Sequence, residues 1–410
     1  MAVMTGLDRI LDVDIEAATV TVEAGVSLDR LMRTLVPMGL WPAVTPGTRQ
    51  VTVGGAIGSD VHGKNHHRDG TFGSHVRSMD LLSPGRGPLT LTPDATPEEF
   101  WATTGGMGLT GLIRRATVDV VPVETAHIRV DSERTPDLDT TMSLMAERDQ
   151  RYRYSVAWID CLARGASLGR SIIEWGEHAR RDDLPPSQRT ADRALRFNPL
   201  DSLPAPPWAP SGLLNRWTVA AFNELWYRKA PRRAEGHVVP LSAFFHPLDL
   251  VSGWNRIYGN RGFLQYQFVL PDGEEATLRR IIEDLVAHRC ASFLAVLKRF
   301  GAADPGPLSF PRPGWTLALD LPVSFGELGG LLDRMDELVV AAGGRVYLAK
   351  DSRLRPELLE AMYPELPRWR EVRERLDPDR RMRSDLLRRL PALTAGTSAP
   401  ASASASGGAR

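Results

Sequence analysis

Residues 51–67, VTVGGAIGSDVHGKNHH, say more about the fold than any other stretch of this chain. Three of the first eight residues are glycine. That is too many for an ordinary strand or helix, so we expect the backbone to approach a bound group closely. Glycine lets backbone N–H groups point at an anion, and the hydroxyls of Thr52 and Ser59 can add donors. The stretch therefore predicts a loop that wraps an anionic ligand.

The segments on either side of this stretch predict a mixture of strands and helices. Alternating residues indicate a strand over residues 18–26, and Ser27 is expected to cap a helix whose apolar residues recur at helical spacing. A second helix should begin at Thr96, with Glu99 completing a capping box. Residues 113–123 alternate again and predict another strand.

Residues 106–111, GMGLTG, formally match the dinucleotide-binding pattern G-x-G-x-x-G. In a dinucleotide-binding fold this pattern follows a strand and opens a helix, so that the helix N-terminus meets the pyrophosphate. Here a predicted helix precedes the pattern and a predicted strand follows it. The pattern therefore indicates a tight helix-to-strand turn with glycines at positive φ.

The composition changes after about residue 126, where Arg- and Pro-rich loops separate strand-like runs such as residues 262–269. We expect a second, α+β domain with an antiparallel sheet. Two later helices are predicted over Glu357–Tyr363 and over Pro378–Leu390, the latter capped by Asp377. The Ala/Ser/Gly-rich end is expected to be a disordered tail. The predicted units are residues 1–125, residues 126–344, residues 345–393 returning to the first domain, and the tail, residues 394–410.

Whole-chain numbers exclude several classes of function. The 410 residues suffice for two domains. A formal net charge of +0 provides no overall field to recruit nucleic acid. The two cysteines, Cys161 and Cys290, cannot build a disulfide framework. We find neither a signal peptide pattern nor a bilayer-length apolar run, so we expect a cytoplasmic protein or one that touches a membrane only peripherally.

Histidines and lysines are unevenly distributed. Four of the nine histidines lie between His62 and His75. A zinc site at His62 and His66 would lack a suitably spaced third ligand, so hydrogen-bonded loop histidines are the simpler interpretation. Only four of the 50 basic residues are lysine, which hints that a compact ammonium is needed where one occurs. Lys298 is expected to be the exception, at a tolerant surface position. The lysines are Lys64, Lys229, Lys298 and Lys350.

Longer motifs resemble a known family. They are VTVGGAIGSDVHGKNHHRDGTFGSHVRSMDLL, FWATTGGMGLTGLIRRAT, NELWYRKA, GFLQYQFVLP and RVYLAKDSRLRPELLEAMYP. In this order they resemble the decaprenylphosphoryl-β-D-ribose oxidases, a branch of the vanillyl-alcohol-oxidase and p-cresol-methylhydroxylase (PCMH) type of flavoproteins, over residues 7–393. The resemblance implies an α+β protein with a PCMH-type FAD-binding domain, a substrate domain with an antiparallel sheet, and non-covalent FAD between them.

The resemblance also assigns roles to individual residues. Lys350 and His62 are the catalytic candidates, because a buried cation beside the flavin can stabilise its reduced state or polarise the substrate hydroxyl. A surface pair between Lys350 and Asp351 is the simpler alternative. Cofactor contacts are expected at Gly47, Thr52, Val53, Gly54, Gly55, Ser59, Asp60, Val61, His62, Ile113 and Tyr347. Substrate contacts are expected at Lys64, Trp226, Gln265, Gln267 and Lys350.

Three departures from the family are visible. Residues 1–14 do not match the family's earlier Gly/Arg-rich loop, which cradles the FAD pyrophosphate, so we expect an N-terminally truncated FAD domain with weakened cofactor binding. Ala318 stands where the family has a cysteine that covalent inhibitors target. Phe245 stands where a tyrosine is usual, which should remove one hydroxyl from the pocket.

The function implied by the resemblance is oxidation of the 2′-hydroxyl of a polyprenyl-phosphoryl ribose to the keto sugar, for arabinan in the cell wall. A short-chain reductase partner would then complete the epimerisation. Two alternatives remain: a D-arabinono-1,4-lactone or alditol oxidase, which shares this fold, and a flavin-less binding module.

Overall fold

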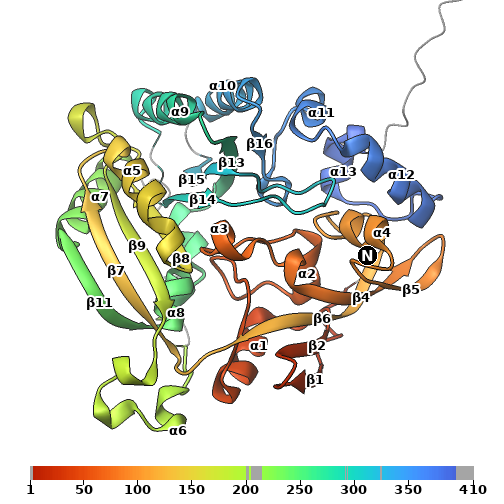
Figure 1. Ribbon diagram of the computed structural model, residues 1–410. Coiled ribbons are helices and arrows are strands. Elements are labelled where there is room, and N and C mark those ends of the chain that lie inside the picture. Colours follow the sequence, from red (N-terminus) through yellow and green to blue (C-terminus); the bar gives the residue numbers. More distant parts are fainter. Residues whose placement is uncertain are drawn as a thin grey trace, which may run out of the picture.

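The computed structural model describes residues 3–199, 203–204, 215–290, 292, 294–323 and 326–393. Figure 1 shows two sheets side by side, with the C-terminal helices packed beside the first of them. The predicted disordered tail, residues 394–410, lies outside the described residues.

The first domain is built on an antiparallel sheet of order β1-β2-β6-β4-β5, with β3 paired to β6. The predicted strands and the predicted first helix are confirmed: the Ser27 hydroxyl accepts the Arg30 N–H at 3.2 Å, and the apolar side of that helix is buried. The elements are β1 (Ile10–Asp14), β2 (Thr19–Glu23), α1 (Leu28–Leu35), β3 (Leu40–Pro42), α2 (Val53–Gly58), α3 (His66–Asp69), β4 (Val76–Ser83), β5 (Gly87–Leu91), α4 (Pro97–Thr103) and β6 (Leu112–Pro122).

The glycine-rich stretch forms a short helix, α2, so the prediction that it would be neither strand nor helix is wrong. Thr52 caps α2, because its hydroxyl accepts the Gly55 N–H at 3.1 Å. A Cβ at residue 54 would lie 2.9 Å from the Ala24 Cβ and 3.1 Å from the Ala24 carbonyl oxygen. Glycine here allows α2 to pack closely against the segment after β2.

Helix α4 begins where predicted, but its capping box is absent. The Thr96 hydroxyl donates to the Thr92 carbonyl at 3.1 Å and accepts the Thr92 N–H at 2.9 Å, so it is not available to the helix. The Glu99 carboxylate pairs with Arg86 at 3.0 Å.

The turn after α4 confirms the prediction made for residues 106–111. It joins a helix to β6, and positive φ angles occur at Gly105 (70°), Met107 (53°) and Gly108 (69°). The backbone of this turn lies against α2, since the Met107 N–H donates to the Gly58 carbonyl at 2.8 Å.

The second domain is built on a larger sheet of order β11-β7-β9-β8-β14-β15-β13-β16, in which every described pair is antiparallel, as predicted. Helices α9 and α10 cover one face of its β13–β15 end (Figure 1). The elements are β7 (His127–Thr135), α5 (Leu138–Arg148), β8 (Tyr154–Ile159), β9 (Ser171–His178), α6 (Ala191–Ala194), β10 (Leu203–Pro204), α7 (Arg216–Lys229), β11 (Arg233–Pro240), α8 (Leu241–Phe245), β12 (Val251–Ser252), β13 (Phe263–Pro271), α9 (Glu275–Ala287), β14 (Ala295–Phe300), β15 (Gly314–Pro322), α10 (Leu328–Ala341) and β16 (Arg345–Val346).

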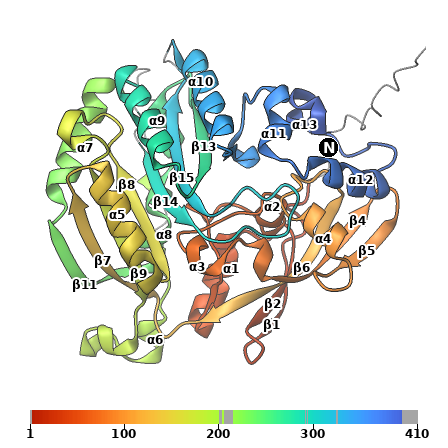
Figure 2. The same cartoon turned by 45° about the horizontal axis from the view of Figure 1, so that its top comes forward.

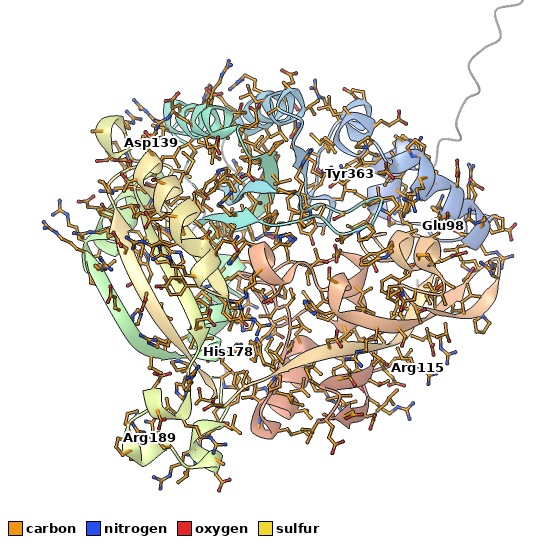
Figure 3. The ribbon with its side chains drawn as sticks, in the orientation of Figure 1. Glu98, Arg115, Asp139, His178, Arg189 and Tyr363 are labelled. Carbon is orange, nitrogen blue, oxygen red and sulfur yellow. The ribbon has the colours of Figure 1, made fainter. Side chains whose placement is uncertain are left out.

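The C-terminal segment joins both domains. Its first residues form β16, which pairs with β13, and its later helices pack on the first domain, where the Trp369 indole N–H donates to the Ala102 carbonyl at 2.9 Å. The Tyr363 hydroxyl, labelled in Figure 3, donates to the Val346 carbonyl at 2.7 Å. The elements are the 3₁₀ turn η9 (Leu348–Lys350), the 3₁₀ turn η10 (Pro356–Leu358), α11 (Leu359–Met362), α12 (Leu366–Leu376) and α13 (Asp385–Arg389).

The helix predicted over Glu357–Tyr363 is confirmed as η10 and α11, but the helix predicted from Pro378 is wrong. Asp377 follows the end of α12, and its carboxylate accepts the N–H groups of Arg381 and Met382 at 2.8 Å each. These bonds hold a loop, and α13 begins only after Ser384.

The connection from β14 to β15, residues 301–313, crosses onto the first domain, as Figure 2 shows. The Gly301 N–H donates to the His66 ring at 3.2 Å, and the Thr71 hydroxyl donates to the Asp304 carboxylate at 3.3 Å. Partly buried polar contacts therefore help to hold the seam between the two domains.

An alanine at residue 54 should destabilise the protein although alanine favours helices. Helix propensity alone would give Gly54→Ala a gain of about 1 kcal/mol, whereas overpacking against Ala24 costs about 1–3 kcal/mol. We expect a lower thermal unfolding midpoint for Gly54→Ala than for the parent. Gly47→Ala is the control, since a Cβ there meets nothing within 4 Å. Equal midpoints for the two variants would contradict this account of α2.

Candidate active site

A cavity of about 720 Å³ opens between α2, the turn after α4, η9 and α13. Its size is in the range of cofactor and substrate sites. Gly54, Gly55, Gly58 and Gly108 line it, and a Cβ at Gly108 would meet nothing within 4 Å, so part of the wall is bare backbone. Such a wall fits an elongated cofactor that approaches the main chain closely. Of the predicted cofactor contacts, Thr52, Gly54, Gly55, Ser59 and Ile113 line the cavity.

The other predicted cofactor contacts lie off this wall. Gly47 is in an exposed loop and Val53 is in the core. Asp60 points inward and accepts the Gly73 N–H at 3.0 Å, and its burial, together with the nearby Asp304 carboxylate, raises its pKa well above the usual range. The cofactor roles of all the residues off the wall stay predictions. The set off the wall is Gly47, Val53, Asp60, Val61, His62 and Tyr347.

His62 is buried among aromatic rings between the two domains. The ring centroids of Phe300 and Tyr347 lie 4.8 Å and 5.2 Å from that of His62. Burial, reinforced by the Lys298 ammonium, lowers the pKa of His62 well below its usual range, so the imidazole is neutral. The other predicted loop histidines are hydrogen-bonded, as expected: His66 accepts the Gly301 N–H, and the ring nitrogens of His67 and His75 lie near backbone carbonyls.

Gln267 connects His62 to the second sheet. Its amide nitrogen lies 2.9 Å from His62 Nε2 and 3.0 Å from the Thr316 hydroxyl. Since the amide nitrogen is a donor, His62 Nε2 accepts and His62 Nδ1 carries the proton. Neither His62 Nδ1 nor Gln267 Oε1 has a hydrogen-bond partner among the described residues. These two buried polar atoms are available to a bound molecule.

Three of the four lysines converge on this seam. Lys298, which was expected at the surface, lies on β14 instead; burial lowers its pKa to about 7, and the nearby Lys350 and Lys64 add to the effect. The Lys64 Nζ donates to the Phe244 carbonyl at 2.6 Å, and burial lowers the pKa of Lys64 to about 8. Burial also lowers the pKa of Lys350. The surface prediction for Lys298 is wrong because its strand turns that side chain toward the first domain.

Asp320 is the carboxylate that acts on Lys350, and the sequence did not single it out. Burial raises its pKa to about 6, although its hydrogen bond from Gln265 and the Lys350 ammonium both oppose the rise. The Gln265 amide donates to one Asp320 oxygen at 2.9 Å, and the other oxygen has no hydrogen-bond partner among the described residues. Strand register could have identified Asp320. In the β13–β15 pair, Asp320 lies opposite the predicted site residue Gln265, just as Ala318 lies opposite Gln267.

Three remaining sequence predictions have clear positions. Trp226 is on α7, partly exposed, with its ring stacked on Phe222 at 5.9 Å, so its place in the pocket wall stays a prediction. Ala318 is on β15, opposite Gln267. Phe245 is buried among aromatic rings, and its ring centroid lies 5.1 Å from that of Trp41.

Within the described residues, no three His, Cys, Asp or Glu side chains are grouped to hold a metal ion.

Comparison with protein families assigns a class to this arrangement. The FAD binding domain family matches residues 1–90, which include Gly54, Gly55 and Gly58 of the cavity wall. The D-arabinono-1,4-lactone oxidase family matches residues 329–390, which include η9. The fold and the cavity thus carry the two sequence signatures of an FAD-linked oxidoreductase.

Individual relatives make the assignment more specific. Decaprenylphosphoryl-β-D-ribose oxidase of Mycolicibacterium smegmatis is 45% identical over 392 residues, which cover 95% of this chain and 84% of that protein. The chain belongs to the family of FAD-linked sugar oxidoreductases that includes this enzyme, and FAD is its cofactor. An uncharacterized protein in the mprA 5′ region of Streptomyces coelicolor is 42% identical, covering 89% of this chain and all of that protein. L-Gulono-1,4-lactone dehydrogenase of Mycobacterium tuberculosis is 25% identical, over 94% and 85%.

Replacing Lys298 should stabilise the protein, most strongly at low pH. The pKa of Lys298 falls from an ordinary 10.5 to about 7 on folding, so the cost of burying its charge is complete below about pH 7 and disappears toward pH 10.5. We expect Lys298→Met to raise the free energy of unfolding by about 1–3 kcal/mol near pH 6, with little effect near pH 10. Denaturant unfolding at both pH values measures this. The exposed Lys229→Met is the control, and a less stable Lys298→Met at low pH would contradict the assignment.

Proposed function

We propose that this protein oxidises the 2′-hydroxyl of a polyprenyl-phosphoryl β-D-ribose to the corresponding keto sugar. The observation that carries the proposal is the grouping of three lysines in the seam, where burial, reinforced by both Lys350 and Lys64, lowers the pKa of Lys298. The carboxylates that act on them are Asp320, near Lys350, and Glu174, near Lys64. Partly buried ammonium groups in excess of carboxylates favour an anionic ligand, because an anion offsets the cost of their burial. A sugar that carries a phosphodiester supplies that charge, and the name of the M. smegmatis relative identifies such a sugar as its own substrate.

Each residue of this lysine and Asp320 cluster is proposed to have a separate role in the reaction. Bound FAD supplies the hydride acceptor. Asp320, with a pKa of about 6, is ionised at neutral pH and can take the proton of the sugar hydroxyl. The Lys350 ammonium lies beside Asp320 and can hold the hydroxyl oxygen in place. Gln265 orients Asp320 through its hydrogen bond, and Lys64 and Lys298 are left to bind the phosphate.

The proposed cofactor site and the proposed substrate site both include residues of one short segment, η9. Leu348 and Ala349 of η9 line the cavity, whereas the next residue, Lys350, belongs to the charged cluster. Oxidation of a hydroxyl needs the two sites in contact, because a hydride moves directly from carbon to the cofactor. The position of η9, with two residues at the cavity and the next one in the charged cluster, supports such a contact.

A D-arabinono-1,4-lactone or alditol oxidase is the second candidate. The match of residues 329–390 to the lactone oxidase family and the similarity to L-gulono-1,4-lactone dehydrogenase favour it. Lactones and alditols are neutral, however, and leave the excess of ammonium groups without a partner. The reductase that would complete an epimerisation stays a prediction from the family resemblance.

Polyprenyl-phosphoryl ribose should bleach the flavin absorbance of the FAD-loaded protein under anaerobic conditions. Aldonolactones and alditols should bleach it at least about tenfold more slowly, since they lack the charge that the lysines bind. Stopped-flow absorbance with each compound at equal concentration measures the difference. Faster bleaching by a neutral sugar would overturn the proposed substrate in favour of the second candidate.

Asp320→Asn should slow flavin reduction by about 10²–10⁴-fold, the usual contribution of a positioned general base. In the parent protein the reduction rate should rise with pH through about pH 6, where Asp320 loses its proton. The variant should lose this low-pH limb, a change that a merely structural role would not produce. Asp320→Glu is the matched control and should retain the limb. A persistent limb in Asp320→Asn would exclude Asp320 as the base.

A further inference from the structure

Helix α7 turns an apolar stripe outward. Trp217 is 71% exposed and Leu225 is 69% exposed, and the exposed Ala221 lies between them. Their spacing of four residues places all three on one side of the helix. On the opposite side, Val219 is fully buried, and the buried Asn223 amide donates to the Asp160 carboxylate at 2.7 Å. The helix is thus fixed to the second domain by one face and presents apolar side chains on the other.

Basic side chains follow this stripe. Glu224, the only acidic residue of α7, pairs with Arg170 at 2.7 Å and with Arg228. The basic residues from the last turn of α7 to the start of β11 are all exposed, and Arg233 among them pairs with Glu235. They are Arg228, Lys229, Arg232 and Arg233. A local cluster of this kind is notable in a chain whose formal net charge is +0. An apolar stripe beside a basic cluster is typical of helices that lie in the plane of a membrane surface.

The charge of the α7 surface decides between possible occupants. A second copy of this chain, docked by two-fold symmetry, would bring the same basic cluster against itself, and like charges would oppose the contact. An anionic lipid surface attracts the basic side chains while its interface accepts tryptophan and leucine. Among the described residues, no helix is long and apolar enough to cross a bilayer.

We propose that α7 docks the protein on an anionic lipid surface through Trp217 and Leu225, with Arg228 and Lys229 against the headgroups. The inference rests on the proposed function, because the polyprenyl tail of the substrate is itself held in a membrane. Figure 1 shows α7 at the outer edge of the second domain, away from β1 and β2 of the first domain. That position leaves the first domain clear of the surface.

Co-sedimentation of the FAD-loaded full chain with vesicles tests the docking directly. We expect binding to vesicles that contain phosphatidylglycerol, weaker binding to pure phosphatidylcholine, and a loss of binding as salt is raised. The double variant Trp217→Gln/Leu225→Gln should lower the partition coefficient about tenfold or more. Arg228→Glu/Lys229→Glu should remove the preference for anionic vesicles. Leu11→Gln/Ile15→Gln is the matched control, because these residues are 41% and 57% exposed in and next to β1.

Two results would overturn the docking proposal. One is equal vesicle binding by the parent and Trp217→Gln/Leu225→Gln. The other is a parent that fails to bind anionic vesicles but forms a dimer, by light scattering, that this variant loses.

A short-prenyl, water-soluble phosphoryl ribose separates this inference from the proposed function. With that compound, the flavin of Trp217→Gln/Leu225→Gln should bleach as fast as that of the parent. With the long-chain substrate in vesicles, it should bleach more slowly than that of the parent. Vesicle binding without bleaching by either substrate would contradict the proposed function and leave the docking intact.

Discussion

The free-energy cost of desolvating three ammonium groups in one partly buried seam is the constraint from which the other features of this structure follow. Lys64 comes from the first domain, Lys298 from the second sheet and Lys350 from the C-terminal segment, and burial lowers the pKa of each. A fold selected for stability alone would replace such groups by apolar side chains. Their grouping, with Asp320 acting on Lys350 and Glu174 acting on Lys64, is the expected pattern for a site that binds an anion and moves a proton.

The C-terminal segment fixes the cofactor wall relative to this cluster. Strand β16 pairs with β13, and the Tyr347 N–H donates to the Gln267 carbonyl at 2.9 Å. The Tyr347 hydroxyl in turn donates to the carbonyl of Ser59, a residue of the cavity wall, at 2.7 Å. One residue therefore links the strand that carries the site glutamines to the end of α2. These residues are thus positioned by one backbone hydrogen bond and by one side-chain hydroxyl that donates to a backbone carbonyl.

The sequence could predict those features that depend on local pattern. The cap at Ser27, the alternation in β6 and the turn at Gly105–Gly111 are local and are confirmed. Helix α2 could not be predicted, because the tertiary contact of Gly54 with Ala24 outweighs the low helix propensity of glycine. The Asp377 prediction failed for a related reason: the same side chain can cap a helix or hold a loop.

For the candidate site, sequence motifs suggested some of the residues that the structure brings together, but not those whose position depends on sheet register. Lys64, Gln265, Gln267 and Lys350 were found through the family resemblance, and the structure brings them into one seam with His62. Lys298 and Asp320 were missed because the side of a strand that faces the site is set by pairing with distant strands.

The midpoint potential of the bound FAD tests the central claim most directly. A cation close to the flavin stabilises the negative charge of its reduced form, so Lys350→Met should make the two-electron potential more negative by about 30 mV or more, equivalent to about 1.4 kcal/mol. The exposed Lys229→Met should leave it unchanged. An identical potential in the parent and Lys350→Met would place Lys350 away from the cofactor and contradict the account of the seam.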